Sequence, residues 1–481
     1  MMSDRTNLKQ SKTGRILYIV FFLILCAIPS AGLLIRGPGR SGENAAARPF
    51  PSVRKEDGSV NVEYLQQAGD WYQEHFAFRQ ELVTANAKLR AALFHESAAD
   101  GVIMGTDGWL YYKDSLPDYQ GTNLLPDRAL YDIAHTAAMT QEYCSLFGIG
   151  YLFALAPNKA TVYPEHMPFY YRHHASDQSN RTRLASFMEK EGVSWLDLGE
   201  RLIKAKQDGE AHALPELYHH RDSHWTAEGA AIAADAILTG PGISHTDYSK
   251  ENYQVRKDFE GDLERMLYPA SVEPEEEVYY DPAPAYGYVD EVESTFDFYI
   301  HTVSGGAGQS LVMYRDSFAN ALLPFMAASY GTAYFTRGTP YTLTDLYECG
   351  ASDAVFLRAE RFLPEIAATV PVLEAFPASE MTLSEAEENL TKAKARVTCA
   401  PEDANPYYAR IEGVLEEAPG SGERIFVSPG DGNLYEAMPL HRADGKEGFA
   451  MYLPQEKADE TVRPDQTEVF IESRAARGSE R

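Results

Sequence analysis

Cysteine is scarce in this chain. Its 481 residues include four cysteines, and no two of them are separated by only two residues. A thiolate zinc site needs closely spaced cysteine pairs, so this spacing argues against one. Cys26 lies in an apolar run near the N-terminus. A disulfide among Cys144, Cys349 and Cys399 is left open by the sequence.

Positive charge is also in short supply. The chain has 43 lysines and arginines against 71 aspartates and glutamates, which gives a formal net charge of −28 and a pI near 4.9. Such an acidic chain is a poor nucleic-acid binder and lacks a broad basic surface for membranes. The one local acidic run, residues 273–277, is typical of a solvated loop rather than a metal site.

Long hydrophobic runs are rare, and the notable one stands near the N-terminus. Residues 16–35 carry no charge and follow four basic residues. This length suits a bilayer-spanning helix, and the basic residues would keep the N-terminus in the cytoplasm. We therefore predict a cytoplasmic tail over 1–15 and a transmembrane signal anchor over 16–35. The alternative is a signal peptide cleaved near Ser30 or Ala31. Both predictions put the remaining chain outside the cytoplasm.

The middle of the chain alternates short apolar strands with helices. Strands are predicted at 150–156, 193–196, 310–314 and 354–357, and helices at 130–146, 182–191, 227–238 and 318–329. Such alternation indicates an α/β fold with a parallel sheet covered by helices on both faces. A helical periodicity over 64–94 predicts a preceding helix with an apolar face in the core.

Composition divides the chain further. We predict a linker over 36–60, a catalytic domain over 61–375 with an inserted lobe at 250–309, a second linker over 376–403 and a small β-rich module over 404–481. By fold-level analogy alone, such a terminal module often binds carbohydrate, and the sequence leaves this open. The inserted lobe is rich in tyrosine and phenylalanine. These rings either pack the lobe itself or form flat faces for sugar rings.

The first chemically informative motif is Asp222-Ser223-His224-Trp225. In an extended segment, residues two apart point the same way, so the carboxylate of Asp222 and the imidazole of His224 would meet. Thr226 suits the N-cap of the helix that follows. His224 is thus expected in a short loop just ahead of a helix.

The second motif is Tyr314-Arg315-Asp316-Ser317-Phe318, about ninety residues later. Ser317 falls where a buried strand gives way to an apolar helix, close to that helix's free N–H groups. The plainer interpretation is that Asp316 and Ser317 cap the helix. Together the two motifs supply an acyl-transfer site, with Ser317 as nucleophile, His224 as general base and Asp222 as the group that orients the base.

Other residues could take part in this chemistry. Asn158 follows the strand 150–156 and is a candidate oxyanion donor, with Lys159 as an alternative electrophilic group; both also suit ordinary turn chemistry. His219 and His220, with Asp222 and His224, could instead bind zinc or iron as in a metal-dependent deacetylase. Adjacent histidines tend to diverge, so we expect no metal.

These motifs resemble a known family. Asp222-Ser223-His224-Trp225 is similar to the Asp-x-His-Trp signature of the AlgX/AlgJ-like alginate O-acetyltransferases and the related DHHW-type proteins, which belong to the SGNH-hydrolase superfamily. Residues 315–318 resemble the family's nucleophile turn, although many SGNH enzymes have glycine where this chain has Arg315. Residues 105–111, 156–159 and 163–165 resemble further family segments. The likeness covers roughly residues 60–375.

The resemblance implies a function. It implies an SGNH-hydrolase-like fold and an extracytoplasmic O-acetyltransferase that acylates an exopolysaccharide or cell-wall polysaccharide through an acetyl-Ser317 intermediate, without a cofactor. It also implies a membrane-bound acetyl exporter of the MBOAT type as the acetyl source. A carbohydrate acetylesterase with the same residues, and a non-catalytic polysaccharide-binding scaffold, remain as alternatives.

Overall fold

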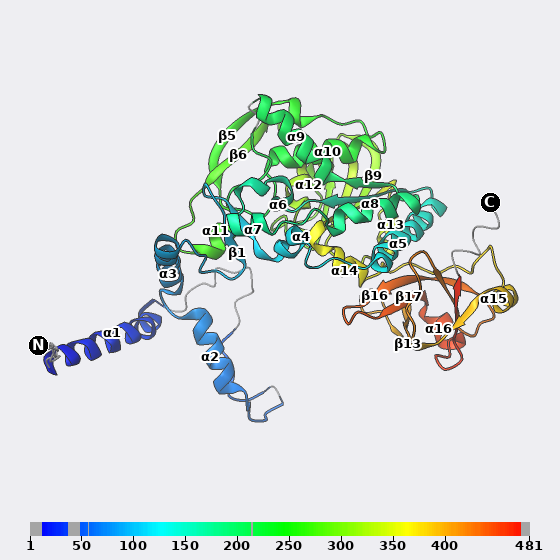
Figure 1. The fold of residues 1–481 in the computed structure, drawn as a ribbon, viewed down its shortest axis with the longest axis horizontal. Coiled ribbons are helices and arrows are strands. Elements are labelled where there is room, and N and C mark those ends of the chain that lie inside the picture. The colour runs from blue at the N-terminus through cyan, green and yellow to red at the C-terminus, as the bar shows by residue number, and fades with distance from the viewer. Residues whose placement is uncertain (1–11, 37–48, 56, 213–214, 473–481) are drawn as a thin grey trace, which may run out of the picture. The chain divides into compact units, whose positions relative to one another are not determined.

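The computed structural model describes residues 12–36, 49–55, 57–212 and 215–472 (Figure 1). The chain divides into two compact units. The first comprises residues 1–104 and 260–275, and the second comprises 105–259 and 276–481.

The first unit is mainly helical. Its elements are α1 (Lys12–Arg36), α2 (Tyr64–His75), α3 (Arg79–Phe94), β1 (Val102–Met104) and α11 (Asp262–Leu267). The single helix predicted over 64–94 is wrong, because Phe78 adopts a left-handed backbone conformation with φ of 64° and separates α2 from α3. Leu65, Leu89 and Leu93 are more than half exposed, so the predicted apolar face is not buried in the chain.

Helix α1 occupies the segment in which a transmembrane anchor was predicted. Across the described part of the chain, no helix combines the length and hydropathy needed to cross a bilayer. The prediction of a membrane-spanning helix over 16–35 is therefore not supported.

A seven-stranded sheet forms the centre of the second unit, in the order β4-β3-β11-β9-β10-β8-β7. The bounds are β3 (Gly150–Ala156), β4 (Trp195–Asp197), β7 (Gly287–Tyr288), β8 (Tyr299–Val303), β9 (Ala307–Arg315), β10 (Tyr330–Thr336) and β11 (Asp353–Ala359). Strands β4, β3, β11, β9 and β10 run parallel, whereas β8 is antiparallel to β10.

The sheet is thus mixed, not wholly parallel as predicted. Only residues 304–306 separate β8 from β9. A parallel connection needs a crossover of a dozen or more residues, so a chain that leaves β8 through so short a link must reverse its direction. The inserted lobe therefore adds an antiparallel edge to the predicted parallel sheet.

Helices cover both faces of this sheet (Figure 1). On one side, α5 (Asp127–Leu146) and α8 (Asn180–Lys190) pack with Phe153, Val312 and Phe356 in a common core. Strand residues on the opposite side are equally buried, and α9 (Leu198–His212), α10 (Ala227–Thr239) and α12 (Ala319–Ser329) form that layer. The predicted two-sided covering is confirmed.

Shorter elements complete the α/β part of the second unit. They are β2 (Leu110–Tyr112), α4 (Leu116–Gln120), α6 (Lys159–Val162), α7 (Phe169–His173), β5 (Asn252–Phe259), β6 (Glu275–Asp281), α13 (Thr344–Glu348) and α14 (Leu363–Ala367), with 3₁₀ turns at Lys113–Ser115, Pro164–His166, Tyr248–Lys250 and Glu360–Phe362. Cys144, Cys349 and Cys399 are all free thiols.

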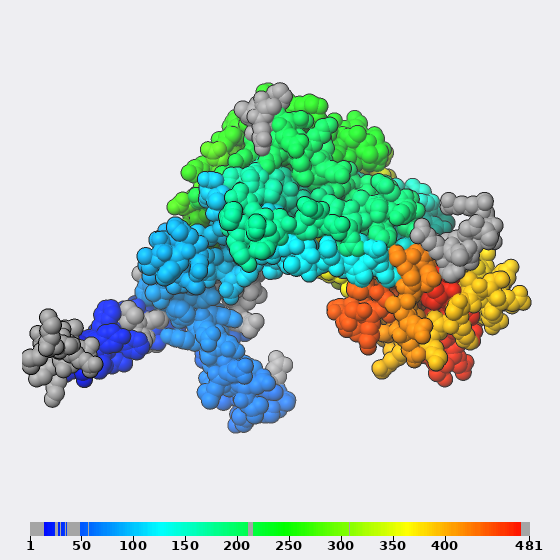
Figure 2. All heavy atoms as spheres, viewed as in Figure 1, coloured from blue at the N-terminus to red at the C-terminus, as the bar shows by residue number. Residues whose placement is uncertain are grey.

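The C-terminal strands form a second sheet with its own core, which we call the β-module. Its elements are α15 (Leu383–Asn389), β12 (Thr391–Ala393), β13 (Ala395–Pro401), β14 (Tyr408–Leu415), β15 (Arg424–Ser428), β16 (Tyr435–His441), β17 (Glu447–Pro454), α16 (Gln455–Thr461) and β18 (Glu468–Glu472). The strand pairs are antiparallel, and the module gathers as one body, yellow to red, in Figure 2. Strands β12 and β13 lie inside the linker predicted over 376–403.

Candidate active site

Ser317 lies in the turn between β9 and α12, as predicted. The preceding residue fixes this turn. One carboxylate oxygen of Asp316 accepts a hydrogen bond from the Phe318 N–H at 2.9 Å, and the other accepts one from the Ala359 N–H at 2.7 Å. Asp316 therefore joins the turn to the end of the neighbouring strand β11. Neither Asp316 nor Ser317 caps α12, whose N-cap is Phe318, and the hydroxyl of Ser317 bonds elsewhere.

His224 lies in a loop that begins after Tyr218 and ends at Trp225. A β-bridge between Tyr218 and Trp225 closes this loop at its base. The helix α10 begins directly afterwards, and the side chain of its N-cap, Thr226, accepts a hydrogen bond from Gly229. The predicted position of the histidine, in a loop ahead of a capped helix, is confirmed.

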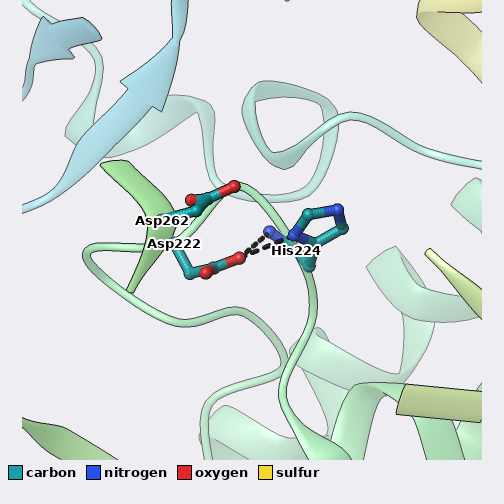
Figure 3. A group of neighbouring side chains, drawn as sticks. All are labelled: Asp222, His224 and Asp262. Carbon is teal, nitrogen blue, oxygen red and sulfur yellow. Dashed lines mark hydrogen bonds and ion pairs between the residues drawn. The ribbon is translucent and has the colours of Figure 1, made fainter. Parts of the chain in front are cut away.

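Asp222 and His224 are in direct contact (Figure 3). The imidazole Nδ1 donates to Asp222 Oδ1 at 2.7 Å, and the backbone N–H of His224 donates to the same oxygen at 2.8 Å. This is an Asx turn, in which an aspartate bonds to the backbone two residues on. The pair therefore forms through a tight bend, not through the extended segment that was predicted. Asp262, also drawn, belongs to the other unit.

The hydroxyl of Ser317 reaches the other side of the same ring. It donates to His224 Nε2 with an oxygen–nitrogen distance of 2.8 Å. Because Nδ1 donates to a carboxylate, the neutral ring presents an unprotonated Nε2 to the serine. The three predicted residues thus converge in the order hydroxyl, imidazole, carboxylate, with the His224 side chain 20% exposed.

The aromatic side chains of Trp225 and Phe318 pack against this arrangement. The indole Nε1 of Trp225 donates to the backbone carbonyl of Phe318 at 2.9 Å. The Phe318 ring meets the His224 ring edge-on, with centroids 4.9 Å apart. The residue after the histidine is therefore hydrogen-bonded to the residue after the serine.

Lys159 is buried beneath the histidine loop. Its ammonium donates to the backbone carbonyls of Leu110 at 2.6 Å, His220 at 2.7 Å and Asp222 at 2.9 Å. An ammonium has three N–H donors, so these carbonyls use all of them. The proposed electrophilic role of Lys159 has no free donor to support it, and the geometry makes it a positioning residue for the loop.

Asn158 lies at the end of β3, 2% exposed. Its side-chain amide donates to Asp118 at 2.9 Å, and its backbone N–H donates to Glu360 at 2.7 Å. Among the described residues, no hydrogen bond joins Asn158 to Ser317 or His224. Its role as an oxyanion donor remains a prediction. One N–H of the side-chain amide donates to Asp118, so the other N–H would have to be the oxyanion donor.

Glu360 ties the ends of β3 and β11 together. Besides the Asn158 N–H, it accepts a hydrogen bond from the Thr161 hydroxyl and faces the guanidinium of Arg181 at 3.2 Å. Complete burial raises the pKa of Glu360 to about 7, although the Arg181 charge and these hydrogen bonds oppose the rise. The carboxyl edge of the sheet thus contains a buried acid that titrates near neutrality.

The neighbouring histidines turn to other partners. His219 stacks on Phe259 with ring centroids 3.7 Å apart and pairs with Glu277 at 3.1 Å. His220 stacks on Trp109 at 4.4 Å. The proposed metal-binding group of His219, His220, Asp222 and His224 therefore does not converge on one centre.

Sequence reasoning missed Arg361. It follows β11, and its guanidinium lies over the rings of Phe318 at 5.2 Å and Phe362 at 4.9 Å. Because Phe318 also touches His224, Arg361 brings a cation close to the site. No motif marks this residue. Its place just beyond a strand end, at the sheet edge where ligands bind in α/β folds, is the signal that could have found it.

Several known proteins are similar to parts of this chain. Residues 102–291 match a family model described as an SGNH hydrolase-like domain, acetyltransferase AlgX. The probable alginate O-acetylase AlgJ of Pseudomonas syringae is 27% identical over 239 residues, which cover 47% of this chain and 52% of that protein. AlgJ of Pseudomonas aeruginosa is 28% identical over 49% of this chain and 58% of its own length.

The chain therefore spans little more than half the length of these relatives. Among solved structures, the O-acetyltransferase domain of Pseudomonas putida AlgJ aligns with 55% of this chain and 92% of its own, at 17% identity and a TM-score of 0.36. The matched family segment includes Asp222 and His224 and ends before Ser317.

Proposed function

Because the chain belongs to the AlgX/AlgJ-like family, we propose that it is an O-acetyltransferase that acetylates hydroxyl groups of a polysaccharide. The observation that carries this proposal is the 2.8 Å hydrogen bond from the Ser317 hydroxyl to His224, whose other nitrogen is bonded to Asp222. A serine so placed is an activated nucleophile.

In the first half-reaction, the Ser317 oxygen attacks the carbonyl carbon of an acetyl donor while His224 Nε2 takes the hydroxyl proton. Asp222 stabilises the resulting imidazolium and keeps the ring in the required tautomer. The tetrahedral intermediate then breaks its bond to the donor's leaving group, and the imidazolium gives that group the proton. The product is an acetyl ester on Ser317, with His224 neutral again.

In the second half-reaction, a sugar hydroxyl attacks the acetyl-Ser317 carbonyl carbon. His224 takes the proton of that hydroxyl, and the Ser317 oxygen leaves and recovers the proton from the imidazolium. The acetyl group ends on the sugar and the enzyme is restored. Attack by water in place of the sugar would release acetate, which is the acetylesterase reaction.

We further propose that the protein acts outside the cytoplasm and receives acetyl groups from a membrane-bound exporter of the MBOAT type. An alginate-like polysaccharide is the proposed acceptor class, since the relatives of known name are probable alginate O-acetylases.

A labelled-acetyl assay tests this function. The purified chain is incubated with p-nitrophenyl acetate carrying a labelled acetyl group and with oligosaccharides, and the products are separated by mass spectrometry. Labelled acetyl esters on sugar support the transferase. Free acetate alone would identify an esterase, and unchanged donor would favour the non-catalytic scaffold. Intact-protein mass spectrometry should detect acetyl on Ser317 when no acceptor is present, and none in Ser317→Ala.

A further inference from the structure

Three exposed aromatic side chains stand on the same edge of the sheet as the nucleophile. They are Phe296, Phe298 and Tyr299, which we call the aromatic edge. Tyr299 is paired with Thr336 of β10, and Thr336 is paired with Tyr314 of β9, three residues before Ser317. Two strand spacings of about 4.8 Å separate Tyr299 from Tyr314, or roughly 10 Å in all.

The loop that leads to these rings is anchored by Arg315. This buried guanidinium donates to the carbonyls of Thr295 at 2.9 Å and Asp297 at 3.2 Å, and to the side chain of Asn320 at 2.7 Å. Burial lowers the pKa of Arg315 to about 10. The position in which many SGNH enzymes have glycine therefore joins the nucleophile strand to the aromatic loop in this chain.

The loop also orders itself. The carboxylate of Asp297 accepts hydrogen bonds from the backbone of Glu293 at 2.8 Å and of Ser294 at 3.2 Å, while Phe298 accepts one from the Arg337 N–H at 3.1 Å. The Arg337 guanidinium lies over the Phe296 ring at 5.4 Å. A preorganised loop loses little freedom when it binds a ligand.

The rings themselves are turned to solvent. Phe296 and Phe298 are each 54% exposed and Tyr299 is 65% exposed, although Ile300, the next residue, is buried. Adjacent exposed aromatic rings held in an ordered loop indicate a binding surface.

We propose that the aromatic edge binds the glycan acceptor, with sugar rings stacked on Phe296, Phe298 and Tyr299 so that a hydroxyl of the chain reaches acetyl-Ser317. This inference rests on the proposed transferase function and names the surface that selects its acceptor. Flat aromatic faces suit the C–H faces of pyranose rings. The acidic residues of the same loop, Asp290, Glu291 and Glu293, disfavour anionic ligands, so a neutral glycan should bind here more tightly than an anionic lipid surface or a polyanionic glycan.

Direct binding tests this surface independently of catalysis. The full chain carrying Ser317→Ala is compared with the triple variant Ser317→Ala/Phe296→Ala/Phe298→Ala by calorimetry with two probes, cellohexaose and a hexamer of mannuronic acid. We expect at least one probe to bind the Ser317→Ala protein, and the triple variant to bind it about tenfold more weakly or worse, as for other ring-stacking contacts. Replacing both phenylalanines with tyrosine should restore binding.

Phe147→Ala, in the Ser317→Ala background, is the matched control, because Phe147 is a 44% exposed aromatic residue at the opposite end of β3. Equal affinity of the triple variant and its parent for the sugars overturns the proposal. It is also overturned if the triple variant loses binding to phosphatidylethanolamine–phosphatidylglycerol vesicles while its sugar binding is unchanged. If sugar binding depends on the rings but the unmutated enzyme forms no acetylated sugar, the surface stands and the proposed transferase function fails.

Discussion

The nucleophile and the base of the proposed site are held by different means. The Ser317 turn connects two regular elements, and Asp316 bonds it to the backbone of the adjacent strand β11. The His224 loop has no regular structure. Its backbone carbonyls converge on one buried ammonium, that of Lys159. The nucleophile turn is thus tied to the sheet, whereas the histidine loop gathers around a buried lysine in addition to its closing β-bridge.

This difference determines how substitutions near Ser317 and near His224 should affect the site. Ser317 is supported by strand pairing as well as by the Asp316 side chain, so its position does not rest on that side chain alone. Lys159 donates to two carbonyls of the histidine loop, so its removal takes a charged donor from both, although the Leu110 N–H still bonds to the His220 carbonyl. Substitutions in the two halves should therefore separate chemistry from positioning.

The largest effect is expected from Ser317→Ala, which removes the nucleophile itself. We expect acetyl transfer to fall by about 10⁴-fold or more, because the remaining site has no atom to carry the acetyl group. Initial rates with p-nitrophenyl acetate measure the loss. Ser310→Ala, at the other end of the same strand, is the control and should retain activity. Substantial transfer by Ser317→Ala would refute the acetyl-serine mechanism.

His224→Gln should cost about 10²–10⁴-fold, the usual contribution of a general base. The rate of the unmutated enzyme should fall as pH drops and the imidazole becomes protonated, since a protonated Nε2 cannot accept the Ser317 hydroxyl. A pH–rate profile measures both effects. The acid limb should disappear in the variant, and its persistence would assign the titration to another group.

Lys159→Met is predicted to lower kcat by about 10–100-fold, because a misplaced base costs rate even when the chemistry is intact. Lys159→Arg should recover part of the rate. Lys206→Met provides the control, since Lys206 is a partly buried lysine that bonds to the Val162 carbonyl and the Glu165 carboxylate. Steady-state kinetics and thermal melting, measured together, show whether the loss is in kcat or only in stability.

Asp316→Asn should have a smaller effect. One of the two backbone N–H groups now bonded to the carboxylate would face an NH₂ group, which costs about 1–3 kcal/mol for an unsatisfied buried donor. The free energy of unfolding in urea measures this cost. A loss of activity as large as that of His224→Gln would contradict the view that the sheet holds the turn.

Glu360 is expected to produce a pH dependence of stability, of the same order as the cost of Asp316→Asn. Its folded-state pKa of about 7 lies above the ordinary value of 4.5. The folded protein therefore holds a proton that the unfolded chain releases between these values, and stability should fall as pH rises through this window. Urea unfolding at pH 5 and pH 8 should show the fall, and Glu360→Gln should reduce it. An unchanged slope in the variant would assign it to other groups.

The sequence was sufficient for elements whose local pattern agrees with their packing. Strand β3 begins and ends where predicted, because a continuous apolar run with a glycine before it suits a strand buried on both faces. Strand β10 was missed, since it follows α12 without a turn signal. The reversed direction of β8 depends on tertiary pairing, which a single strand's pattern does not contain.

Some residues of the candidate site could be found from the sequence and others could not. Ser317, His224 and Asp222 were found from residue types at element boundaries. Lys159 was noticed, but its use as a loop support was not, because the carbonyls it binds belong to segments about 50 and 60 residues away. Arg361 gave no sequence signal, since its importance lies in its proximity to Phe318.

The bond from the Trp225 indole to the Phe318 carbonyl limits how this site moves. This hydrogen bond joins the residue after His224 to the residue after Ser317. Movement of the histidine loop away from Ser317 would break this hydrogen bond, so we expect the loop and the Ser317 turn to move together. Substrates would then have to reach the hydroxyl without separating the two residues.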